Sequence, residues 1–335
     1  MLYLLILFIV ICIIGIKFCD NSSDYLSKNQ TQAIKGFFAM IIFFSHFNQY
    51  AIFDSSVTNN IYLFVIKKIG QLMVTMYLFY SGYGIIKSIE TKKNYIKNFP
   101  KKRILKVLIS FDCAILLYLI VNMILKNKYS LKTILLSFIG WESIGNSNWY
   151  IFVLLMLYLI IYITGVVFKN KIDLKFIIAN ILLDIILIIT LYFTKNDYWY
   201  NIILTFPLGL LYGMFEEKIE KIIKEHYIAI LAMITLCFIG TYISNSFIMY
   251  EFKAIFFSLL IVLLSYKIKI NNRVLEKLGK YSFEMYILQR LFYIIYEKAH
   301  INYILFFTIS LISTIVLSIL FQKVTYLITK NLRGK

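Results

Sequence analysis

The sequence is poor in the residues that mark soluble, disulfide-bonded or metal-binding proteins. Only 16% of its 335 residues are charged, against about a quarter in an average soluble domain. It has two prolines and three histidines, and its four cysteines form no CxxC pair and no cluster with histidine. The sequence therefore predicts neither structural disulfides nor a bound metal.

Familiar catalytic motifs are also missing. The chain contains no GxSxG nucleophile elbow, no HExxH zinc motif and no P-loop. His46 is not followed by the aspartate of the soluble acyltransferase HxxxxD pattern, because Ala51 stands five residues on. The common soluble hydrolases, zinc proteases and P-loop nucleotidases are thereby disfavoured.

The chain is rich in apolar residues, since 61% of its residues are hydrophobic. These residues fall into eleven long runs, which is typical of a polytopic helical membrane protein. The runs are Leu2–Ile16, Ala33–Phe53, Ile69–Ile86, Ile104–Leu125, Trp149–Phe168, Phe176–Phe193, Trp199–Phe215, Tyr227–Ser244, Ala254–Tyr266, Phe283–Tyr296 and Tyr303–Ile328. We expect an all-α bundle with about 10–11 transmembrane helices.

Two segments need separate interpretation. Leu131–Gly140 is amphiphilic and too short to span, so we expect it at the membrane interface. The first run lacks the basic n-region of a secretory signal and is followed by Lys17, so we interpret it as a retained helix. Residues 1–30 are then an extra N-terminal helix with a linker, and residues 31–330 form the main transmembrane domain.

The cations lie mainly in alternate loops. If the N-terminus faces outward and every segment crosses, one face receives those near residues 17–35, 87–106, 169–175, 218–224, 267–280 and 323–335. The other face receives only Lys67, Lys68, Lys126, Lys128, Lys132, Lys195, Lys253 and Lys298. Because cytoplasmic loops are rich in Lys and Arg, this distribution predicts an N-out, C-in orientation. It also accounts for the net charge of +18 without nucleic-acid binding.

The run Ala33–Phe53 carries one lysine at its start and one histidine further in. Lys35 and His46 are eleven residues apart, which on a helix is about 16.5 Å of rise and about 1100° of rotation, so they share a face. We expect His46 about halfway across the membrane as a general base, with Lys35 at the inner surface. A histidine hydrogen-bonded within the bundle and a snorkelling lysine are the structural alternatives.

Two further patterns fit the inner side of the membrane. Lys102, Arg103 and Lys106 follow Pro100 at a helix start and share one face, an arrangement that favours phosphate groups such as those of coenzyme A. Ser81 and Gly82, in the YSGYG segment, would let an acyl-pantetheine chain approach closely. Ordinary topogenic charge and helix packing are the alternatives.

Polar residues at the outer side are candidates for acceptor binding. Glu142, Asn146, Asn148 and Trp149 lie in WESIGNSNW, the longest outward loop, where Trp149 also fits an interfacial aromatic belt. Arg290 lies inside an apolar helix and needs a partner or an aqueous cavity. For Arg290, a structural ion pair and substrate binding both stay open as interpretations.

Taken together, these elements resemble the membrane acyltransferase-3 family of bacterial O-acetyltransferases. The matching pieces are Lys35 and His46 with ten residues between them, YSGYG, KKRILK, NWYIFVLLMLYL and LGKYSFEMYILQ, in the family's order. The chain departs in having an extra first helix. It also has Gln289 and Asn148 near positions where members often have histidine.

The resemblance implies a multi-pass enzyme of the bacterial cytoplasmic membrane that moves an acyl group, usually acetyl, from cytoplasmic acyl-CoA to a hydroxyl of a glycan. His46 would be the catalytic base, Lys35 its partner, and Lys102, Arg103 and Lys106 the basic segment. Acetyl-CoA would be a donor substrate, with no permanently bound cofactor; a homo-oligomer is left open. The alternatives are a transporter or flippase of a lipid-linked sugar, or an accessory scaffold.

Overall fold

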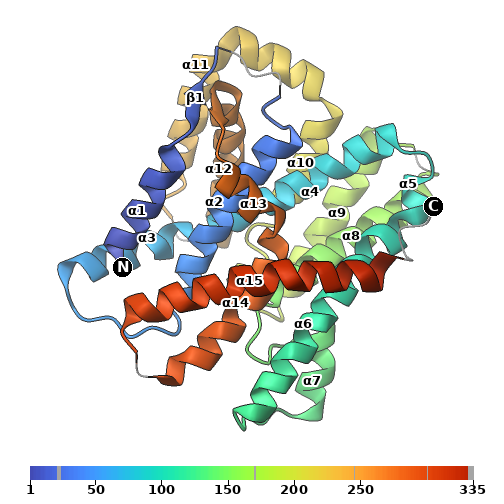
Figure 1. Cartoon of the computed structure of the whole chain (residues 1–335). Coiled ribbons are helices and arrows are strands. Elements are labelled where there is room, and N and C mark those ends of the chain that lie inside the picture. Colours follow the sequence, from blue (N-terminus) through green and yellow to red (C-terminus); the bar gives the residue numbers. More distant parts are fainter. Residues whose placement is uncertain (21–23, 170, 245, 300, 331–335) are drawn as a thin grey trace.

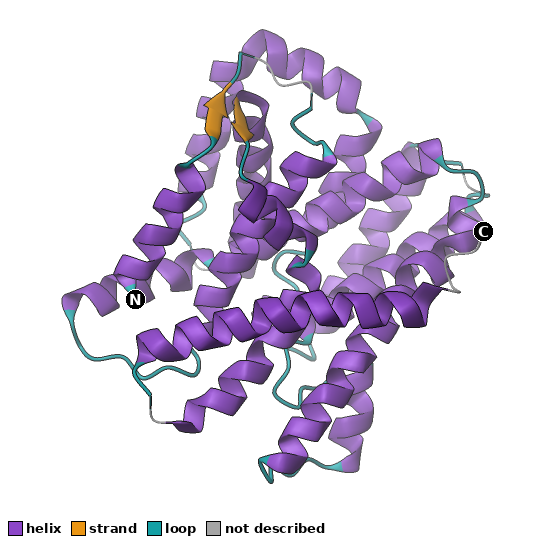
Figure 2. Ribbon diagram, in the orientation of Figure 1, coloured by secondary structure: helices purple, strands orange, loops and turns teal. Residues whose placement is uncertain are grey.

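The computed structural model describes residues 1–20, 24–169, 171–244, 246–299 and 301–330. Figures 1 and 2 show a bundle of helices with one small sheet at its edge. The helices are α1 (Leu2–Ile13), α2 (Lys28–Phe47), α3 (Val57–Ile69), α4 (Leu72–Thr91), α5 (Tyr95–Phe99), α6 (Leu105–Ile124), α7 (Leu131–Phe138), α8 (Trp149–Val167), α9 (Leu174–Tyr192), α10 (Thr205–Met214), α11 (Glu216–Gly240), α12 (Phe247–Lys267), α13 (Arg273–Lys280), α14 (Ser282–Tyr296) and α15 (Tyr303–Thr329).

Long apolar helices dominate this bundle. Within the described residues, seven helical stretches are long and apolar enough to cross a membrane: 57–91, 95–124, 149–167, 174–192, 216–240, 247–267 and 303–329. Each of the eleven predicted runs overlaps a helix, but α1, α2, α10 and α14 are too short or too polar to meet the same criterion. The protein is a polytopic helical membrane protein.

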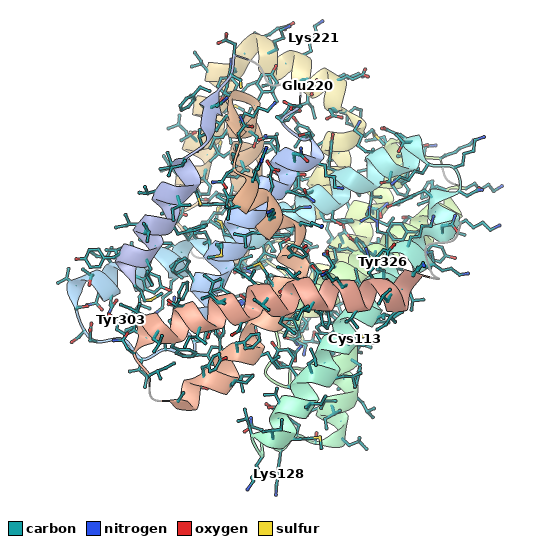
Figure 3. All side chains as sticks on the ribbon, viewed as in Figure 1. Cys113, Lys128, Glu220, Lys221, Tyr303 and Tyr326 are labelled. Atoms are coloured by element: carbon teal, nitrogen blue, oxygen red, sulfur yellow. The ribbon has the colours of Figure 1, made fainter. Side chains whose placement is uncertain are left out.

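The two ends of the bundle carry different loops. Figure 3 shows Lys128, just beyond α6, at one end of the molecule, and Glu220 and Lys221 of α11 at the opposite end. The charge pattern assigns Lys128 to the outer face and Lys221 to the inner face, and these two positions lie at opposite ends of the molecule. Which end faces the cytoplasm is still a prediction from charge, and Arg333 and Lys335 lie outside the described residues.

A small sheet, which the sequence did not predict, attaches the N-terminal segment. Strand β1 (Ile16–Phe18) pairs antiparallel with β2 (Ile268–Ile270). At the other end of α1, the amino group of Met1 donates to Oδ1 of Asn59 at 3.1 Å. The first helix is therefore held at both ends, by α3 and by the chain that follows α12.

The helix with the lysine and the histidine differs from expectation at both ends. The predicted run was Ala33–Phe53, but α2 covers Lys28–Phe47. It starts early because Ser27 caps a polar first turn, which a hydropathy pattern does not include. It stops early because the chain turns after His46, whose carbonyl accepts from the N–H of Gln49 at 3.1 Å. His46 therefore lies in the last turn of α2.

Glycines let α2 and α13 approach each other closely (Figure 1). A Cβ on Gly36 would collide with the carbonyl of Leu275, and one on Gly279 with the carbonyl of Gln32. No larger side chain fits this contact without moving a backbone. Because Lys35 and Lys280 adjoin these glycines, the contact sets the spacing between two cationic positions.

Candidate active site

One stripe of α2 faces two cavities. Lys35, Ala39, Ile42 and His46 are spaced by four, three and four residues, so their side chains line one face of the helix. The first three line a cavity at the start of α2, and the last two line another at its end. The lysine and the histidine, predicted to share a face, thus belong to two cavities joined along one helix.

The other side of α2 is fixed by aromatic packing. The rings of Phe44 and Phe307 stack at 4.5 Å between centroids, and Phe47 meets Phe306 edge-on at 4.9 Å. The hydroxyl of Tyr293 donates to the carbonyl of Phe43 at 2.9 Å. These buried contacts with α14 and α15 fix the rotation of α2 about its own axis. The stripe of α2 therefore faces the cavities.

The inner cavity, at the Lys35 end, has a volume of about 540 Å³ and lies among α2, α4, α6, α8, α13 and α14. Its cations are Lys28, Lys35, Arg103, Lys106 and Lys280. Tyrosine and serine hydroxyls face the same space, and Oγ of Ser81 bonds the hydroxyl of Tyr158 at 2.8 Å. The positive charge of this lining is suited to an anionic ligand.

A wider mouth cavity of about 1,090 Å³ adjoins the inner one and shares several of its lining residues. Its cations are Lys28, Lys92, Lys93, Lys102, Arg103, Lys106, Lys280 and Lys323. Arg103 is partly buried, and its Nε donates to the hydroxyl of Tyr95 at 2.9 Å. The structure thus brings the three predicted basic residues, 102, 103 and 106, to one opening.

The basic residues stand on an irregular turn. Between α5 and α6 the chain forms a π-helical turn, Pro100–Ile104. Proline lacks the N–H that a regular helix would need, and single π turns often occur at functional sites. The turn carries Lys102 and Arg103 at the junction of the mouth and inner cavities.

The outer cavity, at the His46 end of α2, has a volume of about 470 Å³. It is lined by residues from α2, the start of α4, the 143–149 loop and α14: Ile42, Ser45, His46, Gln49, Gly70, Gln71, Val74, Ser143, Asn146, Ser147, Asn148, Trp149, Tyr198 and Arg290. Four of the five predicted acceptor residues, at positions 146, 148, 149 and 290, are therefore beside the histidine. Its polar side chains are mostly neutral amides and hydroxyls, in contrast to the cations of the inner cavity.

The guanidinium of Arg290 is hydrogen-bonded to a side-chain amide. Its Nη2 donates to Oε1 of Gln49 at 2.7 Å, and its Nε is buried without a hydrogen bond in the structure. Among the described residues no carboxylate lies within ion-pair distance of its guanidinium, so the structural ion pair left open by the sequence is not formed. Nε itself has almost no accessible surface, so substrate binding by Arg290 stays a prediction that rests on its place in the lining of the outer cavity.

A thin wall separates the inner and outer cavities. Ile42 and Val74 line both. Gln289 lines the inner cavity, and its Nε2 lies 2.8 Å from Nδ1 of His46 and 3.3 Å from the carbonyl oxygen of Tyr286. One amide therefore connects the histidine of one cavity with the space of the other.

Comparison with known proteins is decisive for the family. The acyltransferase-3 family model, described as an acyltransferase domain, matches residues 29–323. The chain belongs to the acyltransferase-3 family. The matched range contains the whole stripe of α2 and, apart from Lys28, the linings of the inner and outer cavities. This acyltransferase-3 protein is a membrane acyltransferase. No curated protein and no solved structure matched the chain.

Two of the predicted site residues lie elsewhere in this acyltransferase-3 protein. Gly82 is in the contact between α4 and α10, where an added Cβ would collide with the carbonyl of Phe206. It does not line the inner cavity, whereas its neighbour Ser81 does. Glu142 faces a second outer cavity, where it lies 3.6 Å from Nζ of Lys195.

Gln289 is the functional candidate that sequence reasoning missed. The sequence marks it only as a glutamine near a position where members of the family often have histidine. Its contact with His46 joins residues 243 positions apart in the chain. No spacing pattern could have indicated that pairing, although a polar amide beside Arg290 in an apolar helix is a weak signal.

Proposed function

We propose that this protein is an O-acyltransferase that moves an acetyl group from acyl-CoA to a hydroxyl of a glycan, with His46 as general base. One observation carries the proposal. A cation-lined cavity and a histidine-containing cavity meet along one face of α2, separated by Ile42, Val74 and the amide of Gln289. The family membership supplies the reaction class.

Acyl-CoA suits the inner and mouth cavities because its phosphates need several cations. Lys102, Arg103 and Lys106 would bind the phosphates at the mouth, and Lys35 would attract the donor further in. From Lys35 to His46 the helix rises about 16.5 Å. An extended pantetheine arm spanning that rise would bring the thioester to the wall between the cavities.

The chemistry follows from the ring nitrogens of His46. The imidazole takes the proton of an acceptor hydroxyl, and the oxygen attacks the thioester carbonyl. The new C–O bond forms as the C–S bond breaks, and the imidazolium returns its proton to the coenzyme A thiolate. Direct transfer of this kind is the simplest sequence consistent with one histidine at the wall.

Gln289 would determine which ring nitrogen of His46 acts as the general base. With its amide nitrogen toward Nδ1, as in the structure, Nδ1 accepts and a neutral ring carries its proton on Nε2. Turning the amide by half a rotation presents Oε1 to Nδ1–H and frees Nε2 of His46 to act as base, at the cost of the 3.3 Å bond from Gln289 to the carbonyl of Tyr286. We propose that the second orientation is the catalytic one, since it leaves an unprotonated nitrogen for the acceptor.

The acceptor side suits a neutral hydroxylated molecule. Asn148 and Gln49 contribute amides to this lining, Trp149 contributes an aromatic ring, and Arg290 contributes a guanidinium. A surface or lipid-linked glycan matches these groups. We propose the bacterial cytoplasmic membrane as the location, with the inner cavity open to the cytoplasm as the charge distribution predicts.

A transporter or flippase of a lipid-linked sugar is the alternative, because cavities at the two ends of a membrane bundle also suit alternating access. Its cycle would require Ile42 and Val74 to separate far enough for a sugar to pass. It would not require acyl-CoA. Turnover of acyl-CoA therefore distinguishes the two functions.

The test uses membranes containing the full chain, with acetyl-CoA radiolabelled in its acetyl group and the cell's own surface glycan as acceptor. We expect label to enter the glycan, and we expect His46→Ala to reduce this transfer by about 10²- to 10⁴-fold at equal membrane insertion. His226→Ala is the matched control, because His226 is exposed in α11 and lines neither the inner nor the outer cavity. Undiminished transfer by the His46 variant contradicts the mechanism.

A further inference from the structure

A second cavity lies beside the outer cavity and is not needed for chemistry at His46. This Glu142 cavity has a volume of about 400 Å³ and is lined by Trp141, Glu142, Ser143, Asn148, Tyr192, Phe193, Thr194, Lys195, Asn196, Tyr198 and Trp199. Ser143, Asn148 and Tyr198 also line the outer cavity. The two cavities are therefore adjacent, separated by side chains that line both.

Lys195 lines the Glu142 cavity, and its ammonium group is held by several contacts. Nζ of Lys195 lies 3.9 Å from the ring centroid of Trp141 and 4.7 Å from that of Trp199. It also donates to the carbonyl of Trp141 at 2.8 Å. With two ring faces and a carbonyl around it, this cation is already satisfied, so an anionic ligand is not required there.

Glu142 is the more available group. Its carboxylate is 3.6 Å from Nζ of Lys195, a long ion pair, and its side chain is 44% exposed. Such a carboxylate can accept hydrogen bonds from ligand hydroxyls without losing the support of Lys195. The amides of Asn148 and Asn196 and the hydroxyl of Thr194 add further polar groups to the same lining.

Aromatic rings complete the set. Tyr198 is 40% exposed and Tyr192 is 50% exposed, and both tyrosines belong to this lining. Tyr198 is anchored, because its carbonyl accepts from Nε2 of Gln71 at 3.1 Å. Partly exposed rings beside carboxylate and amide groups suit a pyranose, whose C–H face packs on a ring while its hydroxyls bond at the edges.

We propose that the Glu142 cavity is a second carbohydrate subsite, and that the acceptor is a chain of at least two linked sugar rings. The ring to be acylated occupies the outer cavity beside His46, and its neighbour occupies the Glu142 cavity. This inference rests on the proposed function and deepens it. A single sugar, or a small hydroxylated molecule, would leave the second subsite unused.

The test compares acceptors of different length from one source. The probes are oligosaccharides released from the cell's surface glycan by partial acid hydrolysis, and the monosaccharides from its complete hydrolysis, each with labelled acetyl-CoA and purified full-length protein. We expect the wild type to acetylate oligosaccharides at least tenfold more efficiently, as kcat/KM, than monosaccharides.

Two variants address the second subsite alone. Glu142→Gln removes the carboxylate charge at constant size, and Thr194→Trp fills the space from an exposed position. We expect each to lower kcat/KM for oligosaccharides by about 5- to 10-fold, and to leave monosaccharide acetylation and acetyl-CoA hydrolysis unchanged.

Three results would overturn the inference: equal use of both acceptor classes by the wild type, equal losses for both classes in the variants, or no loss at all in either variant. Absence of acetyl-CoA turnover in the wild type has a different meaning. It contradicts the proposed function itself, and with it the basis of the second subsite. The two failures are therefore distinguishable in one set of measurements.

Discussion

The inner and outer cavities lie on one stripe of α2 but differ in chemistry. The inner and mouth cavities are lined by lysines and Arg103, with tyrosine hydroxyls among them. The outer cavity has a single arginine among amides and aromatic rings, and that arginine already contacts an amide. The difference matches two substrates of different charge, a polyanionic donor and a neutral hydroxylated acceptor.

The wall between them is as informative as the cavities. It consists of two aliphatic side chains and one amide, and the amide reaches across to the histidine. Aliphatic side chains at this position would hinder the passage of water between the cavities. A wall of this kind would restrict contact between donor and acceptor to the point where His46 and Gln289 meet.

The largest expected difference between the cavities concerns the donor. We expect Arg103→Leu to raise the KM for acetyl-CoA by roughly 10- to 100-fold, since a charge-assisted hydrogen bond contributes about 1.5–3 kcal/mol. The KM for the acceptor should stay unchanged. Steady-state kinetics with each substrate varied in turn measures both.

Lys101→Leu is the matched control for this prediction, because Lys101 is exposed in the same π-helical turn and lines neither the inner nor the mouth cavity. An equal rise in donor KM in both variants would mean that the turn acts by net charge alone. A rise in acceptor KM would remove the distinction between the cavities.

A smaller effect is expected at the wall. Gln289→Leu removes the hydrogen bond to Nδ1 of His46. We expect kcat to fall by about 3- to 10-fold, because a hydrogen bond contributes roughly 0.5–1.5 kcal/mol. Both KM values should change little, because neither cavity loses a charge. Gln289→Glu, whose carboxylate accepts from Nδ1–H, should retain more activity than Gln289→Leu and shift the pH–rate profile.

Equal kcat values for Gln289→Leu and the wild type would show that the ring of His46 is oriented without this amide. Equal losses in the leucine and glutamate variants, with an unshifted pH profile, would indicate a packing role. Only the combination of rescue and a shifted profile supports control of the tautomer.

The smallest expected effect on chemistry accompanies a loss of stability. Gly36→Ala places a methyl group against the carbonyl of Leu275, and we expect it to destabilise the protein by about 1–3 kcal/mol through overpacking. Any change in kinetics should appear in the KM for acetyl-CoA, since α13 carries Lys280 of the inner cavity. Thermal unfolding in detergent measures the first effect.

Gly84→Ala is the control for this prediction, because a Cβ there has no neighbour within 4 Å. We expect an unchanged or slightly raised Tm, since alanine favours a helix over glycine. A normal Tm for Gly36→Ala would mean that α2 and α13 can separate without cost.

The sequence predicted much of this arrangement because its signals are local. Long apolar runs predicted the bundle, and an eleven-residue spacing on one helix placed Lys35 and His46 on one stripe. The basic cluster and the NSNW segment each lie within a few residues of chain, so their members share a cavity. The family resemblance drawn from these pieces is confirmed by the match over residues 29–323.

What the sequence could not predict depends on tertiary contacts. Gln289 meets His46 only because α14 packs on α2, and β1 meets β2 across most of the chain. Glu142 lines the Glu142 cavity and not the outer cavity because Gly140 and Gly145, at φ of 76° and 102°, turn the loop on either side of it. The end of α2 at Phe47 was missed because apolar residues continue beyond the helix.

Sidedness tests the central claim most directly: donor and acceptor reach His46 from opposite ends of α2. The full chain is reconstituted in vesicles of known orientation, with labelled acetyl-CoA supplied on one face and the glycan acceptor on the other. The account predicts transfer when acetyl-CoA is on the face that carries Lys102 and the acceptor is on the face that carries Lys128, and no transfer in the reverse arrangement. Transfer only when both substrates share one face would contradict it.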